Sequence, residues 1–113
     1  MLVLLFGETK MPYPLTAGPT KTYDYGATID NSTPVVITSS TDGVSNLGKV
    51  KFHSIQCTGD ACVVDVKIGN NSVYTNVDTL DDAIKNLNSH GVTAIRLTVA
   101  SGTCAVSISG TSE

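Results

Sequence analysis

The C-terminal third of the chain alternates apolar and polar side chains with a period of two, over residues 92–99 and again over 103–110. The apolar phase comprises Ile95, Leu97, Val99, Cys104, Val106 and Ile108, and the other phase carries Arg96, Thr98, Ser107 and Ser109. Successive side chains of a strand point to opposite faces, so this pattern predicts two half-buried strands of an antiparallel sheet. The Ser101-Gly102 step between them predicts a hairpin.

Composition supports the same fold class. Only 15% of the 113 residues are charged, against about 25% in typical globular chains. The chain has 15 Thr, 11 Ser and 13 Val, a composition typical of a β-sandwich or barrel whose surface is wetted by hydroxyl groups. The net charge of −3 provides no basic face for phosphates, so we expect no nucleic-acid partner.

Four further strands are expected from short apolar or alternating segments, at residues 35–38, 49–57, 62–68 and 72–77. In the second of these the apolar phase slips by one residue, which predicts a β-bulge near His53-Ser54 or an end-of-strand twist. In the third, the alternation points Cys62, Val64, Val66 and Ile68 inward and exposes Asp65 and Lys67 to water.

Residues 79–90 predict one short helix. Thr79 is a suitable N-cap, Asp81 and Asp82 suit the first turn, and Leu80, Ile84 and Leu87 form an apolar stripe before Gly91. The predicted fold is therefore mainly β: an antiparallel β-sandwich, jelly-roll or Ig-like, with one short helix and an extended N-terminal arm.

The arm is assigned to residues 1–30 and the sandwich to residues 31–113. All four prolines lie between Pro12 and Pro34. Because proline has no backbone N–H to donate to a neighbouring strand, this segment is predicted to be irregular and extended. The apolar run at residues 1–6 is too short to cross a bilayer, so no membrane partner is expected. It is either a peripheral strand, a bystander upstream of an alternative start at Met11, or an arm that docks on another subunit. The tyrosines pack on the domain itself or on a partner. The candidate partner-binding residues are Leu2, Val3, Leu4, Leu5, Phe6, Tyr13, Tyr23 and Tyr25.

The residues that carry chemistry do not form a recognisable site. Cys57 and Cys62 flank a four-residue loop and either form a disulfide or serve, like Cys104, as small core residues. Neither the cysteines with His53 and His90 nor the acids Asp78, Asp81 and Asp82 have metal-ligand spacing. We therefore expect no catalytic residues, no metal and no cofactor, and a protein that is not an enzyme.

The run from Gly91 to Thr103, followed by Val106 to Gly110, resembles the closing strands of small β-sandwich virion proteins of tailed bacteriophages. The shared pattern is carried by Gly91, Ile95, Arg96, Leu97, Val99, Gly102 and Thr103, then Val106 and Ile108, with residues 63–68 as the matching earlier strand. Such proteins include capsid decoration, or cement, proteins and other head or tail accessories. The resemblance implies a virion protein, assembled in the host cytoplasm, that binds the head exterior and bridges capsomers. The predicted helix at 79–90 departs from that pattern, in which a loop is expected.

The partners implied are the major capsid protein or other virion subunits, with homo-oligomers or lattice contacts. A competing hypothesis is a ligand-binding sandwich, of the carbohydrate-binding or adhesin type. That function requires an exposed aromatic platform, and outside the arm the chain offers only Tyr74 and Phe52.

Overall fold

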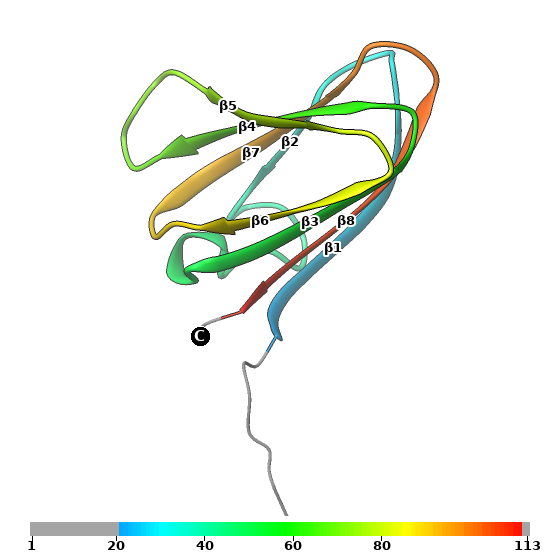
Figure 1. Ribbon diagram of the computed structural model, residues 1–113. Helices are drawn as coiled ribbons and strands as arrows, with labels where there is room; N and C mark the ends of the chain where they lie inside the picture. Colours follow the sequence, from blue (N-terminus) through cyan, green and yellow to red (C-terminus); the bar gives the residue numbers. More distant parts are fainter. Residues whose placement is uncertain (1–20, 112–113) are drawn as a thin grey trace, which may run out of the picture.

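The computed structural model describes residues 21–111, which form two β-sheets packed face to face (Figure 1). The eight strands are β1 (Lys21–Asp30), β2 (Val35–Thr38), β3 (Phe52–Gly59), β4 (Cys62–Ile68), β5 (Thr75–Leu80), β6 (Ala83–Asn88), β7 (Val92–Val99) and β8 (Thr103–Thr111). A 3-10 turn, η1 (Leu47–Lys49), precedes β3. The prediction of a mainly β protein with an antiparallel sandwich is confirmed.

Each sheet has four strands, in the orders β1-β8-β3-β6 and β2-β7-β4-β5. All the strand pairs are antiparallel. Only β4 and β5 are both consecutive and paired, because every other connection leads from one sheet to the other. Neighbours within a sheet are therefore mostly distant in sequence.

The core lies between the sheets and is built from the inward phase of each strand. All six residues of the predicted C-terminal apolar phase are buried, together with Ile37, Ile55, Val64 and Leu80 from the other strands. Val44 and Leu47, from the connection around η1, fill the space at one end. Burial of aliphatic side chains on this scale is the main stabilising contribution to such a sandwich.

The two C-terminal strands do not form the predicted hairpin. β7 pairs with β2 and β4, whereas β8 pairs with β1 and β3 in the opposite sheet. Residues 100–102 therefore turn the chain from one layer to the other, with Gly102 at φ 82°. Alternation identifies the buried face of a strand but not the strand that it pairs with. The positions of the two strands were therefore predicted correctly, whereas their pairing with each other was wrong.

The predicted helix at 79–90 is also wrong, because this segment forms the end of β5, a turn and β6. Asp82 has φ 51°, a left-handed conformation that an α-helix does not contain. β5 pairs with β4 and β6 pairs with β3, so two existing ladders supply hydrogen bonds that outweigh a weak local helix preference. Leu80 is buried, while Ile84 of the supposed stripe is 61% exposed.

The N-terminal boundary of the sandwich lies earlier than residue 30. Residues 21–30, assigned to the arm, form β1, which pairs with β8 from Lys21↔Thr111 to Asp30↔Thr103. Tyr23 and Ile29 of this strand are buried in the core. The prolines that suggested irregular chain lie outside β1, so the strand itself has no missing donor.

β3 has no bulge at His53-Ser54, since both of its ladders keep a continuous register. Val50 enters the core directly after η1, before the strand begins, and Phe52 starts the strand on the outer face. The inward phase is His53, Ile55 and Cys57. The change of phase therefore occurs at the junction between the 3-10 turn and the strand.

Candidate functional site

The candidate partner-binding residues fall into two groups. Leu2, Val3, Leu4, Leu5, Phe6 and Tyr13 lie outside the described residues. Tyr23 is buried within its own domain, and Tyr25 is partly buried against the same core. For Tyr23 the interpretation as a partner contact is therefore wrong, and the alternative of packing on the domain itself is confirmed.

Tyr23 lies beside His53, which sequence reasoning placed only on a strand face. The Tyr23 hydroxyl is 2.6 Å from His53 Nδ1, and both residues are buried. Burial raises the pKa of the Tyr23 hydroxyl, and burial lowers the pKa of His53, an effect partly offset by the nearby backbone of Ser89 and Val50. A protonated phenol and a neutral imidazole are thus favoured, with the hydroxyl donating to Nδ1.

His53 Nε2 is buried without a hydrogen-bond partner. A hollow of about 440 Å³ beside it is lined by Phe52, His53, Ser54, Asn86, Leu87, Asn88 and Thr111. This hollow lies near the end of the molecule where β1 begins, because Phe52 pairs with Thr111 and Thr111 pairs with Lys21. It is open to the surface and contains no charged side chain.

The outer face of the β1-β8-β3-β6 sheet is rich in hydroxyl and amide side chains. We call it the hydroxyl face, and its residues are Asp24, Gly26, Thr28, Asp30, Phe52, Ser54, Gln56, Thr58, Ile84, Asn86, Asn88, Thr103, Ala105, Ser107, Ser109 and Thr111. Two of these sixteen residues, Asp24 and Asp30, are charged, and Asp30 is the last residue of β1. A depression of about 120 Å³ at its centre is lined by Asp24, Ser54, Gln56, Ser107, Ile108 and Ser109.

The hydroxyl face suits contact with protein. Short hydroxyl and amide side chains lose little conformational freedom on contact, and removing them from water costs much less than removing charges. Ser54 already donates a hydrogen bond to Asn86 across β3 and β6, at 2.9 Å. No charged pair has to be separated or desolvated over most of this surface.

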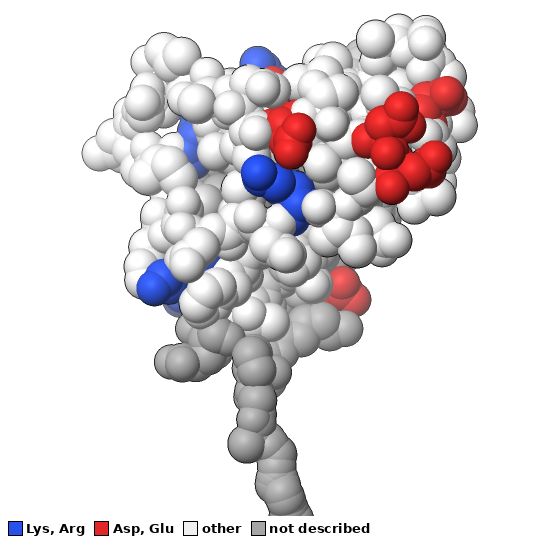
Figure 2. All heavy atoms as spheres, viewed as in Figure 1, with Lys and Arg blue, Asp and Glu red and all other residues white. Residues whose placement is uncertain are grey.

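Most acidic side chains in view lie toward one end of the molecule (Figure 2). Figure 2 shows that most of the face in view is uncharged and that acidic side chains gather toward one end of the molecule. At the end where the strand connections meet, Asp82 accepts a hydrogen bond from the Gly59 amide at 2.8 Å and Asp60 accepts one from the Thr103 amide at 2.9 Å. Asp78 of β5 forms an ion pair with Lys85 of β6 at 3.7 Å. Asp60 and Asp82 therefore hold the turns in place, and Asp78 links β5 to β6. The assignment of Asp82 to the first turn of a helix was wrong.

Tyr74 lies in a cationic environment, near the outer face of the β2-β7-β4-β5 sheet. The Arg96 guanidinium carbon is 4.2 Å from the ring centroid and Lys67 Nζ is 5.1 Å from it. Arg96 also donates to Asp65, at 3.0 Å, and Asn76 donates to the same carboxylate at 3.1 Å. Cations that contact the ring occupy the surface on which a sugar would stack.

Asp65 does not face water as predicted, because only 8% of the residue is exposed. The register between β4 and β5 shifts at Val64/Asp65, and the ladder with β7 shifts at Lys67/Ile68. Beyond these shifts the predicted alternation fails, and Ile68 is exposed rather than inward. The burial of Asp65 is explained by its ion pair with Arg96, which no local sequence pattern indicates.

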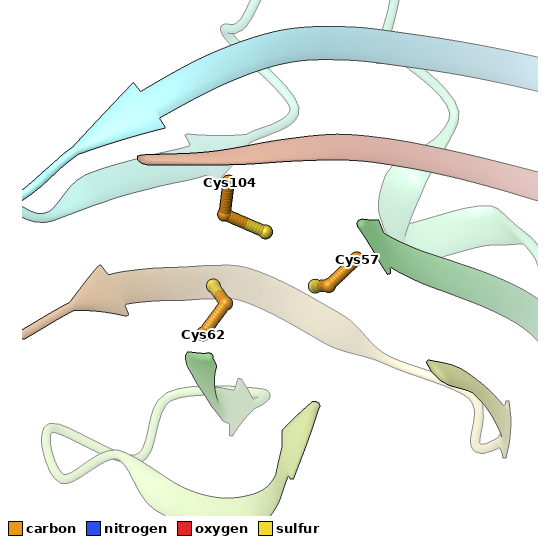
Figure 3. Close-up of side chains that lie close together, drawn as sticks. All are labelled: Cys57, Cys62 and Cys104. Atoms are coloured by element: carbon orange, nitrogen blue, oxygen red, sulfur yellow. The ribbon is translucent and has the colours of Figure 1, made fainter. Parts of the chain in front are cut away.

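The three cysteines form a cluster between the sheets. Cys57 of β3, Cys62 of β4 and Cys104 of β8 are buried and carry free thiols, so the structure contains no Cys57–Cys62 disulfide. Their three sulfur atoms all lie within 4.8 Å of one another. Figure 3 shows the side chains pointing toward a common centre.

The contact between the Cys57 and Cys62 thiols shifts their pKa values in opposite directions. The Cys57 thiol is the main cause of the lowered pKa of Cys62, and the same contact, with burial, raises the pKa of Cys57. Burial raises the pKa of Cys104. The inward phase of each strand predicted that these three positions lie in the core. The convergence of Cys104 with the other two cysteines depends on strand pairing, which the spacing of the cysteines does not encode.

His90 lies in the turn between β6 and β7, not at the C-terminus of a helix. Among residues 21–111, the structure contains no helix long and apolar enough to span a membrane.

No family model matches the chain, and neither does any curated protein. Among solved structures, the chain is similar to one from the Bacillus endospore appendages, described as a novel family of disulfide-linked pili. The alignment covers 91% of this chain and 100% of that chain, with 14% identity and a TM-score of 0.35. A likeness at this level carries no argument about what the protein does.

Proposed function

We propose that this protein is a noncatalytic structural protein of a tailed-phage particle, a capsid decoration or cement protein that binds the head exterior and bridges capsomers. The observation that carries the proposal is the hydroxyl face, a broad sheet surface with two charged residues among sixteen. Such a surface can lie against neighbouring protein at a low desolvation cost.

The strand pairing supports a jelly roll as the finer description of the sandwich. β1 pairs with β8, β2 with β7, β3 with β6 and β4 with β5, as in one long hairpin rolled into two layers. Jelly rolls are used by viral capsid domains and by lectins. Because a fold does not determine a function, the choice between these two classes depends on the surfaces.

The contacts of Tyr74 and Phe52 favour the structural role over carbohydrate binding. Arg96 and Lys67 lie against the Tyr74 ring, and Lys51 Nζ is 5.4 Å from the centroid of Phe52. A carbohydrate-binding surface needs an aromatic ring face open to the sugar, and cations lie against both of these rings.

Attachment to a head can be tight even when each contact is weak. A copy that touches two subunits gains avidity, because its second contact forms at a high effective concentration. In the proposal, the hydroxyl face supplies one contact and residues 1–20, with the apolar run Leu2–Phe6, supply another. At about 3.3 Å per residue, a segment of this length reaches about 65 Å when extended.

Co-sedimentation with tailed-phage heads stripped of their decoration protein tests the proposal. The full-length protein should pellet with the heads to a saturating number of copies. Ser107→Arg places a charge at the centre of the hydroxyl face and should weaken attachment by at least about tenfold. Ser45→Arg, at an exposed position before η1, is the matched control and should bind as the unmodified protein does.

The competing function has a distinct outcome in the same experiment. A protein that stays in the supernatant with heads but is retained on a glycan column would be a ligand-binding module, and the proposal would be rejected.

A further inference from the structure

The cysteine cluster has a geometry that neither the fold nor the proposed attachment requires. Its three residues come from three strands and both sheets, and at most 1% of each is exposed. We propose that Cys57, Cys62 and Cys104 form a three-thiolate binding site for a soft d10 metal ion, and that copper(I) is the ion it accommodates.

The sulfur positions match a trigonal site. With metal–sulfur bonds of about 2.3 Å, three sulfur atoms around one ion lie about 4.0 Å apart. In the structure all three sulfur atoms lie within 4.8 Å of one another, and the side chains point toward a common centre (Figure 3). The sulfur atoms are therefore already close to the spacing that a three-coordinate ion requires.

In the metal-free protein two of the thiols are hydrogen-bond donors. Cys62 Sγ donates to the Val63 carbonyl oxygen at 3.8 Å, and Cys104 Sγ donates to the Ala105 carbonyl oxygen at 3.7 Å. Binding of a metal as thiolates would replace these two long hydrogen bonds by metal–sulfur bonds.

The number of donors selects the ion. Within residues 21–111 the cluster contains three ligand groups, and no other His, Cys, Asp or Glu of that range joins it. Structural zinc sites take four protein ligands, whereas thiolates are soft donors suited to copper(I). Each thiol that binds as a thiolate releases its proton to solvent, and the copper ion keeps its oxidation state.

A bound ion would join the two sheets at a point where no strand ladder connects them. Cys57 and Cys104 belong to β3 and β8 of one sheet, and Cys62 belongs to β4 of the other. Because the ion binds the folded arrangement and not separate strands, occupancy should raise the thermal stability of the protein.

The test is an anaerobic titration of the reduced full-length protein with copper(I), in competition with a chromophoric copper(I) chelator. We expect one ion per chain, a thiolate-to-copper charge-transfer absorption, and a melting temperature raised by at least about 5 °C at saturation. X-ray absorption of the copper should show a shell of three sulfur atoms.

Two variants separate the metal site from general effects on the core. Cys104→Ala should abolish the absorption and the shift in melting temperature. Val99→Ala, a buried position opposite Cys62 in the β4–β7 ladder, removes a similar amount of core without removing a ligand and should keep both. Circular dichroism of the two copper-free variants establishes that each is folded before titration.

The proposal is overturned if the reduced protein fails to withdraw copper(I) from the chelator. It is also overturned if Cys104→Ala binds as tightly as the unmodified protein, or if the copper shell contains fewer than three sulfur atoms. None of these results depends on whether the protein attaches to phage heads.

Discussion

Tyr23 and His53 show how a single contact can reverse the interpretation of a residue. Tyr23 follows a proline-rich segment and resembles a surface aromatic in sequence, yet its hydroxyl has a buried imidazole 2.6 Å away. Gly110 lies opposite in the β1–β8 pair, and a Cβ at that position would be 2.0 Å from the tyrosine ring. The position of the ring therefore depends on a glycine 87 residues later, which no local pattern can reveal.

Burial of His53 predicts that the protein loses stability as the pH falls below 6.5. Burial lowers the pKa of His53 from 6.5 in the folded state, so the unfolded chain binds the proton more readily. The contribution to stability is complete above 6.5 and is lost as the pH falls from 6.5 toward the lowered folded-state value. Urea unfolding above and below pH 6.5 measures this loss.

The control for this prediction is His53→Gln, which is polar and does not titrate in this range. Its free energy of unfolding should depend less steeply on pH, although the variant is less stable throughout. Equal pH dependence of the two proteins would show that His53 is not the group responsible.

At the scale of elements, periodicity predicted buried faces well and connections poorly. The alternation at 92–99 and 103–110 identified both strands and all six of their buried residues. It could not assign the strands to different sheets, because side-chain order carries no information about the partner strand. The same limit explains why the cysteines were predicted as core residues but not as a cluster.

The prediction of a helix at residues 79–90 was wrong for a different reason. Its helix signals were real but weak, and they compete with two complete strand ladders formed by residues far away in sequence. Asp82 suits both structures, as a first-turn acid in a helix and as a left-handed residue in a turn. Only the tertiary context decides between them.

The turn at Asp82 provides a test of this account. Asp82→Ala loses the acceptor for the Gly59 amide and retains an unfavourable left-handed conformation, so it should destabilise the protein by about 1–2 kcal/mol. Asp82→Asn keeps an acceptor and tolerates that conformation, and it should remain near the unmodified protein. Asp82→Gly should lie between them. Urea unfolding gives the order, and an alanine variant as stable as the asparagine variant would contradict it.

For the whole molecule, composition predicted the fold class and the low-charge surface, because both follow from the abundance of Val, Thr and Ser. The boundary at residue 30 was wrong because the whole proline-containing segment up to Pro34 was interpreted as irregular chain, whereas β1 begins at Lys21, after Pro19, and ends before Pro34. The hydroxyl face could not be predicted, since it is assembled from four strands that are mostly not consecutive in sequence.

The most direct test of the account compares the full-length protein with a chain that begins at Lys21, in the binding assay with stripped phage heads. Because the sandwich begins at β1, the shortened chain should unfold at the same urea concentration as the full-length protein. Its attachment to heads should be weaker by at least about tenfold, because one of two linked contacts has been removed. Equal occupancy of the heads by the two chains would contradict the proposed role of residues 1–20 in holding this sandwich to its neighbours.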